Sequence, residues 1–293
     1  MISVVIPLYN KELSIRSTIQ SVLDQTFQDY EVIVVNDGST DNSLQIVQTL
    51  YDPRVKLISK SNGGVSSARN VGIKNAIYPY IAFLDADDIW EPTYLEEQWK
   101  MIQDFPDAGM WGTSWGTQIG NTRFLRTTKI EAGFRGYITD YFKRHLFLYY
   151  TCVTVINKDI FNKIDMFDER ISCGEDLDLW YRIILNFPVA YYEKTLVYYR
   201  QDSENRITLS KKDITKHFVY YIDKFDSYRK VDFFFKKYYE HEVLGHLFNQ
   251  FYIHDRKNPE IHALLSKIDF SIQPFSYKFR FKFPKLYLWL KKI

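Results

Sequence analysis

The sequence is poor in cysteine and contains no long apolar run. Among its 293 residues are two cysteines, Cys152 and Cys173, too few for a disulfide framework, which favours a reducing compartment. No apolar stretch approaches the roughly 18 residues that a membrane-spanning helix needs. Residues 1–6 begin an apolar strand and lack the basic segment of a secretion signal. We therefore expect a cytoplasmic protein without a spanning helix.

Several nucleotide-binding and nucleic-acid-binding motifs are also missing. No G-x-G-x-x-G follows the first predicted strand, which disfavours a dinucleotide-dependent oxidoreductase. Residues 7–10, Pro-Leu-Tyr-Asn, stand where a nucleotidyltransferase would need a loop rich in Gly, Arg and Lys to bind a triphosphate. The acidic N-terminal part and the lack of a nucleic-acid-binding motif argue against a nucleic acid partner.

Charge is distributed unevenly along the chain. Residues 1–210 hold 21 Lys and Arg against 27 Asp and Glu, whereas residues 211–293 hold 17 against 9. This asymmetry predicts a catalytic body followed by a basic region with an anionic partner. We place the boundary near 205–212, which gives a domain at 1–208 and a helical region at 209–293.

The first hundred residues alternate between strand and helix patterns. Unbroken apolar strands separated by amphipathic helices predict an α/β fold with a mostly parallel central sheet flanked by helices. The predicted strands are Ile2–Ile6, Val32–Val35, Val55–Ile58 and Tyr80–Leu84, and the helices are Lys11–Leu23, Ser43–Leu50 and Val65–Ala76. Later we predict strands at Met110–Trp115, Thr151–Ile156, Val189–Tyr192 and Leu196–Tyr199, a helix at Gly174–Leu185, and helices from Lys211 onward.

An acidic cluster, residues 85–88, follows the fourth predicted strand. Residues two apart in a strand point the same way, so Asp85 and Asp87 are predicted to present oxygens to one point. Mg²⁺ and Mn²⁺ bind such oxygens and carry phosphates with them. An isolated Asp-x-Asp is more often a solvated turn, since Asp is a turn residue.

Four polar segments, each following a predicted strand, together form a specific signal. They are residues 7–12 (PLYNKE), 36–39 (NDGS), 62–70 (NGGVSSARN) and 85–88 (DADD). Parallel strands bring such segments to one edge of the sheet, where α/β proteins bind ligands.

These segments resemble those of the inverting, nucleotide-sugar-dependent glycosyltransferases of family 2, which have the GT-A (Rossmann-like) fold. The resemblance covers about residues 1–205 and is strongest over 1–100. A later match, Gly174 to Trp180 (GEDLDLW), is similar to the helix start where this family keeps its catalytic base.

The resemblance implies a role for each matching residue. Asp176 would be the general base, and Glu175 would orient the site or the acceptor. Asp87 and Asp85 would hold Mn²⁺ or Mg²⁺ on the diphosphate. The nucleotide-binding residues would be Pro7, Leu8, Tyr9, Glu12, Asp37, Arg69, Asp85, Ala86 and Arg200.

Two departures from the family pattern narrow the expected activity. Members often carry a His shortly after the Tyr-Arg pair that here is Tyr199-Arg200, but this chain continues Gln-Asp-Ser, which leaves the third metal ligand undefined. The Gln-x-x-Arg-Trp motif of processive synthases is absent, so we expect one sugar per encounter.

The resemblance implies an inverting, metal-dependent hexosyl- or hexosaminyltransferase. It would use a nucleotide sugar, UDP-linked by preference, and a saccharide or lipid-linked saccharide acceptor in bacterial-type surface polysaccharide or glycolipid assembly. The alternative is a catalytically silent, membrane-docked nucleotide-sugar-binding protein of the same fold; the intact acids argue against it.

The C-terminal region is rich in aromatic and basic residues. Residues 211–293 hold 21 of the 51 aromatic residues, and after residue 270 there are six cations and no acid. Interleaved basic and aromatic residues at 277–292 suit an anionic membrane surface, which predicts a peripheral location at the inner face of the cell membrane. A helical subdomain with solvated lysines is the alternative, and it is favoured for residues 233–235 and their neighbours.

Overall fold

The computed structural model describes residues 1–205 and 213–291, and these form two compact units. One unit comprises Met1–Thr139 and the described residues from Phe147 to Asn205. The other comprises Asp140–Leu146 and the described residues from Asp213 onward. The predicted boundary at 208 lies outside the described residues.

A single mixed sheet forms the core of the first unit. Its main order is β3-β2-β1-β4-β9-β6-β10-β5, with β7 paired to β6 and β8 paired to β10. The first four of these strands are parallel, and β9 joins them to β6 by antiparallel pairing on both sides. The strands are β1 (Ile2–Leu8), β2 (Tyr30–Asp37), β3 (Val55–Lys60), β4 (Tyr80–Phe83), β5 (Ile89–Trp90), β6 (Met110–Ile119), β7 (Thr122–Leu125), β8 (Arg135–Tyr137), β9 (Thr154–Asn157) and β10 (Val189–Arg200).

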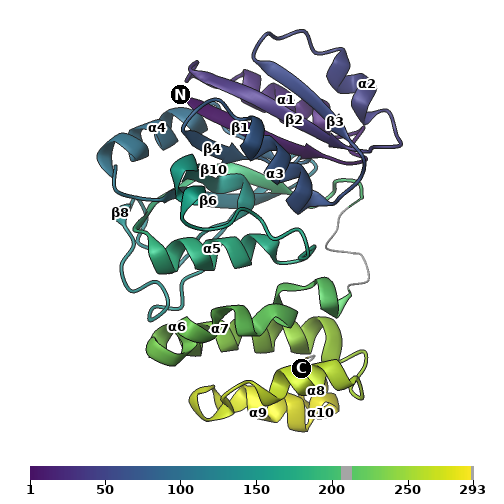
Figure 1. The fold of residues 1–293 in the computed structure, drawn as a ribbon, viewed down its shortest axis with the longest axis vertical. Helices are drawn as coiled ribbons and strands as arrows, with labels where there is room; N and C mark the ends of the chain where they lie inside the picture. The colour runs from purple at the N-terminus through teal and green to yellow at the C-terminus, as the bar shows by residue number, and fades with distance from the viewer. Residues whose placement is uncertain (206–212, 292–293) are drawn as a thin grey trace. The chain divides into compact units, whose positions relative to one another are not determined.

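Helices cover both faces of this sheet (Figure 1). Alternate residues of β1, from Ile2 to Leu8, share a core with buried residues of α1 (Ile15–Leu23), α2 (Ser43–Gln48) and α4 (Tyr94–Asp104). Val5 points to the opposite face and meets α3 (Val65–Asn75), where a Cβ added to Gly72 would lie 2.3 Å from Val5 Cγ1. Only glycine therefore allows α3 to approach β1 so closely. Helix α5 (Glu175–Asn186) lies with α3 on the face turned toward the viewer in Figure 1.

The predicted α/β architecture is confirmed, with three local corrections. The strand predicted at Thr151–Ile156 starts with a 3-10 turn, η1 (Thr151–Val153), and only Thr154–Asn157 form strand β9. The two short strands predicted at 189–199 form one long strand, β10, whose register against β6 shifts between Tyr192 and Val197. Strand β4 ends at Phe83, so Asp85 and Asp87 lie in the turn beyond it rather than in the strand. The strand alternation used to predict their common direction therefore does not apply to them.

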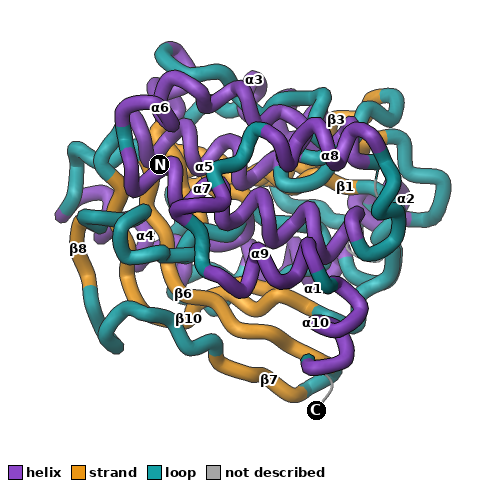
Figure 2. Tube along the Cα trace, turned by 90° about the horizontal axis from the view of Figure 1, so that it is seen from below, coloured by secondary structure: helices purple, strands orange, loops and turns teal. Residues whose placement is uncertain are grey.

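The second unit is helical in its described residues, as predicted (Figure 2). Aromatic side chains fill its core, among them Phe225, Phe235 and Tyr239. Within the described residues no helix has the length and apolar character to cross a membrane. The helices are α6 (Asp226–Val231), α7 (Phe233–His246), α8 (Pro259–Ser266), α9 (Phe275–Lys282) and α10 (Pro284–Leu290), with shorter turns η4 (Ile214–Lys216), η5 (Phe218–Phe225), η6 (Leu247–Tyr252) and η7 (Phe270–Ile272).

Candidate active site

The loops after β1, β2 and β4 meet at one edge of the sheet. The first two are joined by hydrogen bonds from Asn10 N to Ser39 Oγ (3.1 Å) and from Thr40 N to Asn10 Oδ1 (2.8 Å). Asn10 has a φ of 51°, a left-handed conformation that non-glycine residues seldom adopt outside turns and functional loops. The loop after β1 is thus held in one conformation at the edge where ligands bind in parallel sheets.

Arg69 on α3 connects two of the predicted acidic segments. Its guanidinium, only 3% exposed, donates to Asp85 Oδ1 (2.8 Å) and to Glu175 Oε1 (2.7 Å). Burial opposes its charge, but the carboxylates of Asp85 and Glu175 outweigh this and raise the pKa of Arg69. The turn after β4 and the start of α5, 90 residues apart in sequence, are therefore brought together by one cation.

Asp176 lies beside the Arg69 network, and its carboxyl group titrates at a higher pH than an ordinary aspartate. Its carboxylate accepts a hydrogen bond from Leu177 N (2.8 Å) and a long one from Thr151 Oγ1 (3.4 Å). Burial and the charge of Glu175, opposed by Arg69, raise the pKa of Asp176 to about 7. A carboxyl group that titrates near neutral pH is suited to proton transfer.

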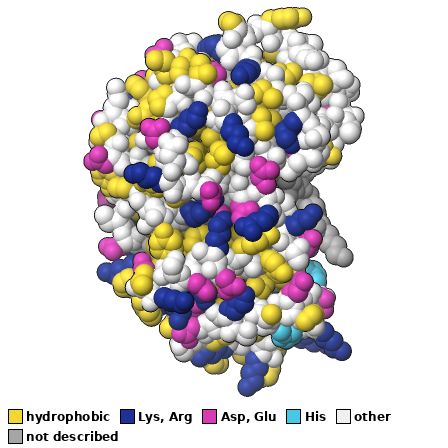
Figure 3. All heavy atoms as spheres, viewed as in Figure 1, with side chains coloured by type: hydrophobic (Ala, Val, Ile, Leu, Met, Phe, Trp, Pro, Cys, Tyr) yellow, Lys and Arg dark blue, Asp and Glu magenta, His cyan; other side chains and the backbone are white. Residues whose placement is uncertain are grey.

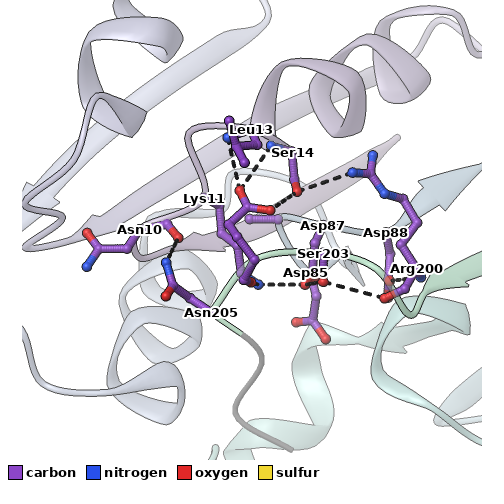
Figure 4. A network of polar contacts seen from close by, with 12 residues as sticks. Asn10, Lys11, Leu13, Ser14, Asp85, Asp87, Asp88, Arg200, Ser203 and Asn205 are labelled. Carbon is purple, nitrogen blue, oxygen red and sulfur yellow. Dashed lines mark hydrogen bonds and ion pairs between the residues drawn. The ribbon is translucent and has the colours of Figure 1, made fainter. Parts of the chain in front are cut away.

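Asp85 and Asp87 are each engaged by a different cation. Asp87 Oδ2 accepts hydrogen bonds from Lys11 Nζ (2.6 Å) and Ser203 Oγ (2.7 Å) (Figure 4). Asp85 instead contacts Arg69. Next to Asp87, Asp88 is fully buried, and burial together with the charges of Asp87 and Asp85 raises its pKa well above its usual range. Asp88 Oδ1 accepts a hydrogen bond from Arg200 N (3.1 Å).

Residues 200–205 form a segment that crosses the loop after β1 (Figure 4). The Glu204 carboxylate accepts hydrogen bonds from Leu13 N (3.0 Å), Ser14 N (3.1 Å) and Ser14 Oγ (2.5 Å), and its carbonyl accepts one from Lys11 Nζ. Arg200 donates to Ser17 Oγ (2.8 Å). The end of β10 is thus fastened to the loop that leads into α1.

The remaining predicted residues lie around the same edge with different exposures. Both oxygens of Asp37 bind the protein itself: Oδ1 accepts from Gly63 N and Lys60 Nζ, and Oδ2 accepts from Gly64 N. Glu12 accepts hydrogen bonds from Asn42, and the Tyr9 ring is 46% exposed. Pro7 is half-buried within β1, whereas Leu8 and Ala86 are buried, so Leu8 and Ala86 offer a ligand little beyond their backbone atoms.

A model of the family described as glycosyl transferase family 2 matches residues 3–165, more than half of the chain. The chain belongs to glycosyl transferase family 2. An uncharacterized glycosyltransferase of Rickettsia felis is 30% identical over 231 residues, which cover 74% of this chain and 36% of the relative. Chondroitin synthase of Pasteurella multocida is 45% identical over 98 residues, 33% of this chain and 10% of that protein. This chain spans about a third of the length of the first curated relatives that it matches.

The fold of this family 2 member is also similar to solved structures of S. aureus TarS. Residues 1–349 of TarS, in complex with UDP-GlcNAc, match with a TM-score of 0.63 at 19% identity over 96% of this chain and 73% of that chain. The complex with UDP gives 0.58 at 23% identity, over 68% and 60% of the two chains. This likeness confirms the predicted GT-A fold.

The carboxylates at the site of this family 2 member fit a divalent cation in part. The described residues contain no group of three or more His, Cys, Asp or Glu side chains placed to hold a metal. One oxygen each of Asp85 and Asp87 makes no hydrogen bond with the described residues, and carboxylate oxygens are the donors that Mg²⁺ and Mn²⁺ prefer. In this structure the cation that pairs with Asp87 is the Lys11 ammonium group.

Two site residues, Ser203 and Glu204, were not predicted from the sequence of this family 2 member. The stretch from Gln201 to Asn205 has the composition of an ordinary polar turn. The contacts of Glu204 join residues 190 or more positions apart, which no local pattern reveals. Only the missing His after Arg200 marked the segment as unusual.

Proposed function

We propose that the protein transfers a sugar from a nucleotide sugar to an acceptor hydroxyl, with inversion at the anomeric carbon. The observation that carries the proposal is the Arg69 network, which joins Asp85 to Glu175 next to an Asp176 carboxyl that titrates near neutral pH. We propose UDP as the nucleotide because the similar TarS structures are described as complexes with UDP and UDP-GlcNAc.

In this proposal Asp176 is the general base. Its carboxylate takes the proton of the acceptor hydroxyl as that oxygen attacks the anomeric carbon, and the bond from that carbon to the diphosphate oxygen breaks on the opposite face. Glu175 is fixed by Arg69 and orients the acceptor side of the site. A hexose or hexosamine is the proposed sugar, and a surface polysaccharide or glycolipid is the proposed product.

Asp87 and Asp85 are the residues proposed to hold Mn²⁺ or Mg²⁺. A bound cation would neutralise charge on the departing diphosphate. Asp87 Oδ1 and Asp85 Oδ2, which make no hydrogen bond with the described residues, are the oxygens proposed to contact it. Tyr9, Glu12, Asp37 and Arg200 are proposed to line the nucleotide pocket with the backbone of Pro7, Leu8 and Ala86.

Substitution of Asp87 tests this assignment. We expect Asp87→Ala to lose the part of UDP binding that depends on Mn²⁺, measured by calorimetry with and without the metal, and to lose transfer from a UDP-sugar. Asp104→Ala is the matched control, since Asp104 pairs with Arg135 elsewhere in the same unit. If Asp87→Ala keeps both metal-dependent binding and transfer, the metal assignment is wrong. Thermal shift with a panel of nucleotide sugars then identifies the donor.

A binding protein without turnover is the competing proposal. It predicts that UDP-sugars bind but are neither hydrolysed nor transferred. Asp176 argues against it, because a protein that only binds has no need for a half-buried carboxyl with a pKa displaced toward neutrality.

We also propose that the C-terminal helices contact an anionic membrane surface, which would place the protein at the inner face of the cell membrane. Four large apolar side chains of this part are 46–58% exposed: Phe283, Leu286, Trp289 and Leu290. Lys and Arg side chains stand beside apolar ones over α9 and α10 (Figure 3). Position 292 of the predicted segment 277–292 lies outside the described residues.

A further inference from the structure

The helical unit contains a polar cavity of about 220 Å³. Five polar side chains of α7 and η6 line it, and Tyr277 of α9 lies across from them; the five are His241, Glu242, His246, Asn249 and Gln250. Their spacing places them along one side of a continuous helix. All of them belong to the second unit, so the cavity is complete within it.

Two hydrogen-bond acceptors at this cavity have no donor. The Glu242 carboxyl makes no hydrogen bond or ion pair within the described residues, and burial raises its pKa. Gln250 Oε1 is buried without a partner, while its Nε2 lies 2.9 Å from His246 Nδ1. A buried acceptor without a donor is destabilising, so a ligand that donates to Gln250 Oε1 is stabilised by it, and the half-buried Glu242 carboxyl offers a second acceptor.

The helix geometry at the cavity is unusual. Helix α7 continues directly into η6, a π-helix over Leu247–Tyr252, which widens the helix where Asn249 and Gln250 face the cavity. π-Helical turns are rare and occur frequently at functional sites. The opposite wall is held in place, since Tyr277 Oη lies 3.1 Å from His241 Nε2 and the Arg280 guanidinium lies 4.4 Å from the Tyr277 ring centroid.

The chemistry of the lining selects the class of ligand. No Lys or Arg lines the cavity, which disfavours phosphate and carboxylate ligands. No metal-binding group of three occurs in the described chain, which disfavours a cation. Carboxyl, carboxamide and imidazole groups around a cavity with room for one six-membered ring suit a neutral molecule with many hydroxyl groups.

We propose that this cavity binds one pyranose unit of a saccharide. Glu242 and Gln250 Oε1 accept hydrogen bonds from its hydroxyl groups, and Asn249 donates to a ring or hydroxyl oxygen. The role of the site in holding an acceptor glycan away from the reacting sugar rests on the proposed function. The binding of a pyranose in the cavity does not depend on that function.

Saturation-transfer NMR on the full chain tests the proposal, with methyl glycosides of glucose, galactose and N-acetylglucosamine as probes. We expect at least one glycoside to bind, and Glu242→Ala to weaken it by about tenfold, the effect of losing one hydrogen bond to a charged group. Gly245→Leu is a second variant. A Cβ at Gly245 meets only Tyr277 Oη at 3.5 Å, so the leucine favours the helix and fills the cavity. Glu260→Gln, in α8 and outside the cavity, is the matched control.

The same samples separate this site from the catalytic one. UDP binding with Mn²⁺ should be unchanged in Glu242→Ala and Gly245→Leu, whereas Asp87→Ala should lose metal-dependent UDP binding and keep the glycoside signal. The proposal is overturned if no glycoside binds, or if both cavity variants bind it as tightly as the unchanged protein.

Discussion

Each unit contains an arginine with little solvent exposure between two acids, and the two arginines have different surroundings. In the helical unit Arg229 pairs with Asp226 and Glu240, and the fully buried Glu240 uses its second oxygen to accept from Asp269 N. In the sheet unit Arg69 pairs with Asp85 and Glu175, but one oxygen of Asp85 remains available.

The surroundings of these arginines explain the difference. Glu240 makes hydrogen bonds through both oxygens and contributes to structure. The Arg69 network differs in that Asp176, next to Glu175, has a pKa of about 7. Arginine–carboxylate ion pairs alone therefore do not mark a functional site; a neighbouring carboxyl with a pKa displaced toward neutrality does.

The largest expected effect is on Asp176. Asp176→Asn removes the proposed base, so we expect kcat for transfer to fall by roughly 10²–10⁴-fold while UDP binding is kept. In the unchanged protein transfer should rise with pH through about 7, as the Asp176 carboxylate forms. A flat pH profile, or an active Asp176→Asn, would contradict the role.

The same substitution should have the opposite effect on stability. The pKa of Asp176 is higher in the folded chain than in the unfolded chain, so its contribution to stability is present at low pH and is lost as the pH rises from about 4 through about 7. At pH 8 Asp176→Asn should therefore unfold at a higher temperature than the unchanged protein. Calorimetry at pH 5 and pH 8 checks this, since the gain should shrink at the lower pH.

The second largest expected effect is on the stability and UDP binding of variants that lack one of the two arginines. Removing either leaves one buried carboxylate, Glu175 or Glu240, without its cation, so we expect Arg69→Ala and Arg229→Ala each to lose about 3–5 kcal/mol of unfolding free energy. Below their melting temperatures only Arg69→Ala should lose UDP binding, because Arg69 alone contacts Asp85. Equal UDP affinity in the two variants would show that the Arg69 network is also merely structural.

Sequence reasoning succeeded best where strands are short, apolar and parallel. β1, β2 and β3 contain every predicted strand residue. β1 and β2 were predictable because buried parallel strands carry continuous apolar runs. It also matched Arg69, Asp85 and Glu175 to one family pattern, and the structure places them in one network. The contacts that could not be predicted join residues far apart in the sequence. Glu204 contacts Ser14 only because β10 ends beside α1.

For the helical unit, the sequence predicts much less of the side-chain arrangement. Its residue pattern predicts helices but not which faces meet, since α7 begins with three consecutive aromatic residues, Phe233–Phe235, which point to different sides of the helix. The cavity at Glu242 depends on a π-helical turn that has no sequence signal of its own. For the sheet unit, the family pattern indicated which side chains lie together. The matching family model ends at residue 165, so no such pattern is available for the helical unit.

The smallest expected effect is at the C-terminal helices. Exchanging Lys285 and Lys291 for Gln should cost about 1 kcal/mol for each charge, roughly a 30-fold loss of affinity for anionic vesicles in a sedimentation assay at low salt. Lys216→Gln with Lys257→Gln changes net charge equally at exposed positions outside α9 and α10. If both pairs weaken binding alike, net charge alone draws the protein to the vesicle. If only the first pair does, the exposed Trp289 and Leu286 beside those lysines define the membrane-facing surface of the unit.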